Sequence, residues 1–162
     1  MSGPTLRRHQ PLTDRPGGST MADVVRVMTE LRVGALIVKK EGSDAVAGMV
    51  TSDQLTRLLS RILDDPEQDL DTRMRFSPIC EVMASAATMA SVAPQDSVES
   101  CITLMKERGL RHLPVLEADG SIVGVISLKD ILVLIQGGYL CPKCCERPCF
   151  LQVALPGAYS YG

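Results

Sequence analysis

The sequence predicts an α/β protein made of two copies of one small unit, packed sheet to sheet with pseudo-twofold symmetry. The repeat is the first observation: Thr20–Val38 aligns with Ser97–Val115 without a gap, and Gly48–Leu59 aligns with Gly124–Ile135. The second is that apolar residues in each copy change from helical spacing to short strand-like runs. Because a unit of about 50 residues buries little apolar surface alone, the two copies are expected to pack sheet against sheet.

The first copy is expected to open with a helix, because Thr20 and Asp23 have the spacing of a helix N-cap and its partner. A strand over 33–38 is predicted from the run Val-Gly-Ala-Leu-Ile-Val. A polar turn and a second strand follow, and a helix closes the copy. These last elements are expected at residues 41–44, 45–51 and 53–63.

The second copy repeats this order and adds an opening strand over 89–93, which Pro94 ends. Its first helix is expected to begin after Ser97, whose partner is Ser100. The first copy has no counterpart of the opening strand. The remaining elements of the second copy are a strand, a turn, a strand and a helix, expected at 113–116, 118–121, 122–127 and 128–136.

The chain is accordingly expected to fall into five segments. These are a flexible arm, a first repeat, an acidic linker, a second repeat and a cysteine-rich, disordered tail, over residues 1–18, 19–63, 64–77, 78–136 and 137–162. The linker carries a run of carboxylates that we interpret as a solvated surface, with cation binding as the alternative.

Composition excludes several classes of function. Lys and Arg number 17 against 19 Asp and Glu, so the basic excess of a nucleic-acid protein is missing. Aromatic residues make up 3% of the chain, and four of the five lie beyond residue 138, so a base-stacking platform is not expected. No apolar stretch is long enough for a membrane helix, and residues 1–18 lack the apolar core of a secretory signal. The expected location is intracellular, in the cytoplasm or the mitochondrion.

The residues of the two copies resemble a known family. The second copy, Gly109-Leu-Arg-His-Leu-Pro-Val115 followed by residues 119–132, resembles a cystathionine-β-synthase (CBS) domain. The first copy resembles its partner, and the pair is similar to a stand-alone Bateman module. The run Ile135–Tyr139 is also similar to the end of plant and protist mitochondrial proteins that consist of a single CBS pair.

This resemblance implies a cleft between the copies that binds an adenosine nucleotide, of AMP, ADP or ATP type. In the signature Gly-x-x-Ser-x-x-Asp, Ser127 ends a strand before a helix, so its hydroxyl and the first helix amides can meet a phosphate or ribose oxygen. Asp130 is implied as the ribose anchor. Arg111 and His112 are implied as phosphate ligands. The alternatives are that Ser127 and Asp130 only cap a helix, and that Arg111 and His112 are solvated.

The first copy departs from this signature. Thr51 takes the hydroxyl position, Gln54 takes the carboxylate position, and Gly34 and Ala35 take the positions of the basic pair. We therefore expect one competent site, in the second copy, with Thr51 contributing at most to a weak one.

Six cysteines form two sets. Cys80 and Cys101 are isolated and are interpreted as small buried residues. The others crowd into the tail, where disorder, a metal site and a redox pair are the alternatives. The candidate metal ligands are Cys141, Cys144, Cys145 and Cys149.

The sequence thus predicts a regulatory module with no catalytic residues and no required cofactor. An adenosine nucleotide would change how the chain docks to a target protein. A homodimer is expected through stripes on the two opening helices, comprising Val24, Met28, Leu31, Cys101, Ile102 and Met105. The alternatives are a dimeric scaffold that ignores ligands and a switch in the cysteine tail.

Overall fold

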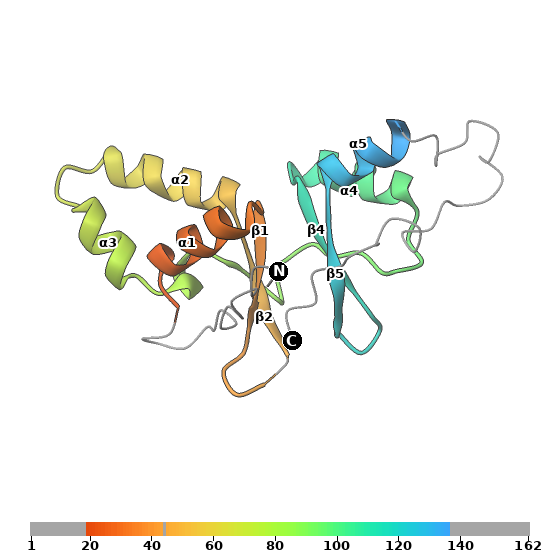
Figure 1. Cartoon of the computed structure of the whole chain (residues 1–162), viewed down its shortest axis with the longest axis horizontal. Coiled ribbons are helices and arrows are strands. Elements are labelled where there is room, and N and C mark those ends of the chain that lie inside the picture. Colours follow the sequence, from red (N-terminus) through yellow and green to blue (C-terminus); the bar gives the residue numbers. More distant parts are fainter. Residues whose placement is uncertain (1–18, 44, 137–162) are drawn as a thin grey trace, which may run out of the picture. The chain divides into compact units, whose positions relative to one another are not determined.

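The computed structural model describes residues 19–43 and 45–136, which divide into two compact units between residues 83 and 84. Each unit combines helices with a small antiparallel sheet (Figure 1). The predicted α/β class and the repetition of one pattern are therefore confirmed.

The first unit is a β-hairpin covered by helices. It contains α1 (Met21–Leu31), β1 (Ala35–Lys39), β2 (Val46–Thr51), α2 (Ser52–Leu63), α3 (Leu70–Phe76) and a 3-10 turn, η1 (Ile79–Glu81). Within this unit β1 and β2 pair in antiparallel order, and the two-residue strand β3 (Ala84–Ser85) follows the division between the units. The buried side chains come from α1, the hairpin, α2 and η1: Val24, Met28, Leu36, Val38, Ala47, Val50, Leu55 and Ile79.

The second unit repeats this plan with α4 (Val98–Arg108), β4 (His112–Leu116), β5 (Ile122–Ser127) and α5 (Leu128–Gln136). Its core is equivalent: Val92, Val98, Cys101, Met105, Leu113, Val115, Ile126 and Ile131. The opening strand expected at 89–93 is reduced to one parallel bridge, between Val92 and Val115. Val92 donates its N–H to the carbonyl of Pro114 at 3.0 Å and accepts from Leu116 at 2.9 Å.

The two hairpins share an irregularity that supports the repeat. The register of β1 and β2 shifts between Val38 and Lys39, and that of β4 and β5 shifts at the equivalent step, between Val115 and Leu116. The helices before the hairpins also end alike. Arg32 and Gly109 both take a left-handed conformation, with φ of 55° and 63°.

Substitution at these two left-handed positions is expected to change stability in opposite directions. Gly109→Ala should lower the free energy of unfolding by about 1 kcal/mol, because a Cβ is disfavoured at positive φ. A Cβ there would meet no atom within 4 Å, so the backbone alone causes the loss. Arg32→Gly should raise it by about 0.5 kcal/mol. Urea unfolding of both variants measures this, and equal signs would contradict it.

The segment that joins the repeats contains a helix, α3, that the sequence did not predict. Its N-cap is Asp69, which accepts from the N–H of Thr72 at 2.9 Å, and Asp71 pairs with Arg75 at 2.7 Å. Hydrogen bonds from the side chain and the backbone of Thr72 hold the pKa of Asp69 below its ordinary value. Carboxylates of the acidic run therefore serve as caps and ion-pair partners.

The end of this segment packs on the first unit. Ile79 is buried in the first core, and its N–H donates to the carbonyl of Ser19 at 3.0 Å. The structural division therefore comes after residue 83, whereas the sequence placed the start of the second repeat at residue 78.

The expected dimer stripe is wrong for four of its six residues. Val24 and Met28 in α1, and Cys101 and Met105 in α4, are buried in the core of their own unit. Of the predicted six, Ile102 is exposed by 37%, and on α1 it is Val25, outside the predicted stripe, that is exposed, by 38%. Both helices have apolar residues on two faces, so spacing alone did not show which face is covered.

The two isolated cysteines differ. Cys101 is fully buried as expected, but Cys80 is exposed, because η1 turns it outward from the core. Burial raises the pKa of the Cys101 thiol to about 11, and the charge of Asp96 adds to the effect.

Cys101 is expected to make the fold lose stability at alkaline pH. The folded thiol keeps its proton above the pKa of the unfolded thiol, so stability falls as pH rises from about 9 towards 11. The loss is about 2 kcal/mol at pH 10.5 for a shift of this size. Cys101→Ala should remove that part of the alkaline loss, measured by urea unfolding at pH 8 and 10.5. An unchanged pH slope would contradict it.

Candidate functional site

The β4–β5 hairpin brings three of the predicted site residues together. His112 begins β4 and lies opposite Ser127, the last residue of β5, in the antiparallel register. The carbonyl of Arg111, one residue earlier, accepts from the N–H of Leu128 at 2.8 Å. The start of α5 is thus fixed to the residues that enter β4 (Figure 1).

Asp130 joins this group through a reciprocal cap at the start of α5. The N–H and the hydroxyl of Ser127 both donate to Oδ2 of Asp130, at 2.8 and 2.6 Å. In return the N–H of Asp130 donates to the hydroxyl oxygen of Ser127 at 3.2 Å. Asp130 is exposed, and among the described residues neither recorded bond uses its Oδ1. The carboxylate is therefore held through Oδ2, and Oδ1 has no recorded bond among the described residues.

The same bonds limit what the helix terminus can offer an anion. The amides of Leu128 and Asp130 already have partners within the corner. Lys129, which the sequence reasoning did not single out, supplies the first-turn amide with no recorded partner among the described residues. Phosphate binding by several helix amides, one possibility raised by the sequence, is thus reduced to one amide and the nearby side chains.

The first unit contains the same corner with uncharged residues at the positions of Asp130, Arg111 and His112. Thr51 donates its N–H to Oε1 of Gln54 at 2.7 Å, and the N–H of Gln54 donates to the Thr51 hydroxyl oxygen at 3.3 Å. Ala35 lies opposite Thr51, and the carbonyl of Gly34 accepts from Ser52 at 2.9 Å. Backbone and cap are equivalent to those of the second unit, but no carboxylate or basic side chain stands at the equivalent positions.

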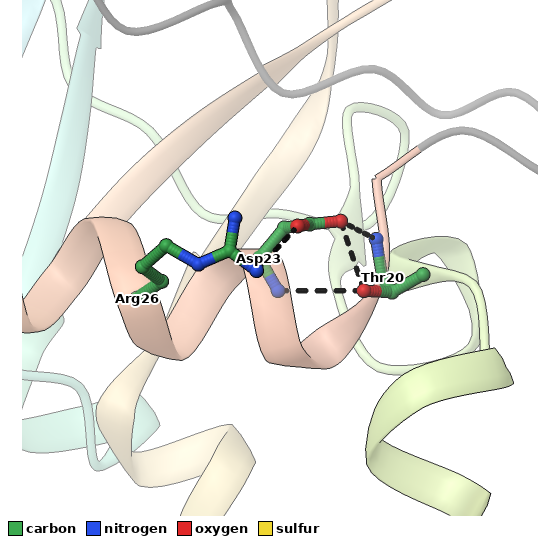
Figure 2. A network of polar contacts seen from close by, with 3 residues as sticks. All are labelled: Thr20, Asp23 and Arg26. Carbon is green, nitrogen blue, oxygen red and sulfur yellow. Dashed lines mark hydrogen bonds and ion pairs between the residues drawn. The ribbon is translucent and has the colours of Figure 1, made fainter.

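A third cap shows that this hydrogen-bond pattern alone does not mark a site. At the start of α1, Thr20 donates its N–H and hydroxyl to Oδ2 of Asp23, both at 2.9 Å, and Arg26 approaches Oδ1 at 3.4 Å (Figure 2). This pair has the chemistry of Ser127 and Asp130 without a hairpin end beside it. What distinguishes the α5 corner is the cap together with Arg111 and His112.

The metal site and the membrane helix considered from the sequence were also sought in the described residues. Across the described ranges 19–43 and 45–136, no cluster of His, Cys, Asp and Glu could hold a metal ion, and the candidate ligands Cys141, Cys144, Cys145 and Cys149 lie outside those ranges. Among the helices that the structure describes, none has the length and apolar character to span a membrane.

Comparison with known proteins identifies the repeats. The family model of the CBS domain matches residues 8–61 and 79–137. A mitochondrial CBS domain-containing protein of Arabidopsis thaliana, CBSX3, is 28% identical over 136 residues. That match covers 74% of this chain and 62% of the relative, so the chain spans about three fifths of the relative's length.

Solved structures show the same fold. A protein with CBS domains from Burkholderia ambifaria is 28% identical, with a TM-score of 0.61 over 80% of this chain and 85% of that one. A CBS domain protein of Pyrobaculum aerophilum, solved in complex with AMP, is 20% identical. It has a TM-score of 0.58 over 80% of this chain and 93% of that one.

Proposed function

Because the chain belongs to the CBS domain family, we propose that it is a non-catalytic regulatory module whose second repeat binds one adenosine nucleotide at the α5 corner. The observation that carries this proposal is the fixed carboxylate of Asp130 at a helix start that is hydrogen-bonded to the backbone of Arg111 and whose cap residue, Ser127, lies opposite His112. The complex of the Pyrobaculum aerophilum protein with AMP supports the ligand class.

Asp130 is proposed to bind the ribose. Oδ2 is occupied by Ser127, which leaves Oδ1 to accept from the 2′ and 3′ hydroxyls. Hydrogen bonds to a charged acceptor contribute about 1.5–3 kcal/mol each, and an orientation fixed in advance reduces the entropy lost on binding. The cap and the ribose contact are therefore compatible roles of one carboxylate.

The remaining parts of the nucleotide have different partners. Arg111 and His112 are proposed to contact the first phosphate, because a guanidinium matches phosphate oxygens in a bidentate manner. The base is proposed to lie between aliphatic side chains. Among the described residues the one aromatic side chain is Phe76, which is 75% exposed on α3. It belongs to the first unit, whereas the proposed site is in the second.

The first repeat is proposed to leave its corner empty. The side-chain oxygen of Gln54 already accepts a hydrogen bond from Thr51. Gly34 and Ala35 have no charged side chain that could bind a phosphate. Regulation would then follow from one bound nucleotide. We propose that it reports the energy state of the cell by altering how a homodimer of this chain docks to a target protein.

Thermal unfolding with a panel of ligands tests the proposal. AMP, ADP or ATP at 100 times its dissociation constant should add about 2.7 kcal/mol to the free energy of unfolding, which raises the melting temperature by several degrees. Guanosine and cytidine monophosphates serve as controls for the base. The proposal is overturned if no adenosine ligand at millimolar concentration shifts the transition.

A further inference from the structure

Lys129 departs from a preference that three of the other four described α-helices follow, α1 being the exception with Ala22. The second residue of α2, α3 and α4 is a carboxylate, namely Asp53, Asp71 and Glu99. A carboxylate is favoured there because the N-terminal end of a helix is electropositive, and a cation is disfavoured for the same reason. At this position α5 has Lys129. Local departures from such preferences are expected at functional residues.

The repeat shows what the substitution does to the charge of the corner. Lys129 occupies the position that Asp53 occupies in the first unit. Arg111 and Lys129 carry two positive charges against the one negative charge of Asp130. In the first unit the positions of Arg111 and Asp130 are uncharged. The only charge among the matching positions is therefore the negative charge of Asp53. The backbone of the two corners is the same, so this reversal of charge is their main chemical difference.

Lys129 is also available to a ligand. Its side chain is exposed, and within the described ranges no ion pair or hydrogen bond is recorded for its ammonium group. It adjoins Asp130, which anchors the ribose in the proposed function, while Arg111 and His112 suffice for a single phosphate. A further flexible cation in the same first helical turn as the ribose anchor therefore suits an anion with more charge than a monophosphate.

We propose that Lys129 is a specificity-determining residue of the second-repeat site and that it contacts phosphates beyond the first, so that the ligand is a nucleoside di- or triphosphate in preference to a monophosphate. This inference rests on the proposed function of the α5 corner. It names the ligand class within that site and creates no separate site.

Titration calorimetry of AMP, ADP and ATP tests the inference, first in EDTA and then with Mg²⁺. The unmodified chain should bind ADP or ATP more tightly than AMP. Lys129→Gln should weaken ATP at least 10-fold and AMP less than 3-fold. Lys106→Gln removes an exposed lysine from α4 and should leave all three affinities unchanged.

A second variant reports on the helix itself. Lys129→Asp installs the residue of the first repeat, so the ligand-free protein should melt at a higher temperature while ATP binding falls further than in Lys129→Gln. Tighter binding of AMP than of ATP by the unmodified chain, or an equal loss for both ligands in Lys129→Gln, overturns the inference. Failure of all three nucleotides to bind would instead overturn the proposed function, so the two failures are distinguishable.

Discussion

Asp130→Ala is expected to weaken adenosine nucleotide binding at least 100-fold. The substitution removes the acceptor of both ribose hydroxyls, and each hydrogen bond to a carboxylate contributes about 1.5–3 kcal/mol. It also removes the partner of Ser127 at the start of α5, which should lower the free energy of unfolding by about 1 kcal/mol. Titration calorimetry and urea unfolding measure the two effects separately.

Two further variants separate binding from folding. Asp130→Asn keeps an oxygen for Ser127, as Gln54 does for Thr51, so stability should change little while binding is lost. Asp23→Ala removes the matching cap of α1 and should cost similar stability without changing affinity. If Asp23→Ala and Asp130→Ala weakened binding alike, loss of stability rather than loss of a ligand contact would explain both results.

The second large effect is expected in the cores. Leu113→Ala should lower the free energy of unfolding by about 3–5 kcal/mol, because the side chain is fully buried and its removal leaves a cavity. That is a large part of the 5–15 kcal/mol typical of a folded domain. The equivalent Leu36→Ala should cost less, since Leu36 retains 7% exposure. Urea unfolding followed by circular dichroism measures both.

Either variant could contradict the packing described for the two cores. A loss below about 1 kcal/mol for Leu113→Ala would mean that the second hairpin is not packed on α4 and α5 as described. A larger loss for Leu36→Ala than for Leu113→Ala would mean that the two cores differ in a way that the shared pattern hides.

The elements that sequence predicted best are those with two independent signals. The predicted strand 122–127 and helix 128–136 coincide with β5 and α5, because the apolar run ends at Ser127 where the cap pair begins. The helix α3 was missed because it buries no residue. It is held by Asp69 and by the pair of Asp71 with Arg75, which are local polar contacts without an apolar stripe.

The sequence predicted the site only in part. The resemblance to the family signature pointed to Ser127 and Asp130, but it could not show that Ser127 bonds one carboxylate oxygen and leaves the other. The bond from Leu128 to the carbonyl of Arg111 was also invisible, since a backbone contact depends on the register of the hairpin and not on side-chain type. The charge of Lys129 is informative only beside the second residues of the other helices, three of which are carboxylates.

The central claim is that one nucleotide binds per chain at the α5 corner, and the stoichiometry of binding tests it most directly. Titration calorimetry of the full chain with ATP and AMP should give one nucleotide per chain, with no binding to Asp130→Asn and unchanged binding to Gln54→Ala. Two nucleotides per chain, or binding that survives Asp130→Asn and disappears in Gln54→Ala, would contradict the claim.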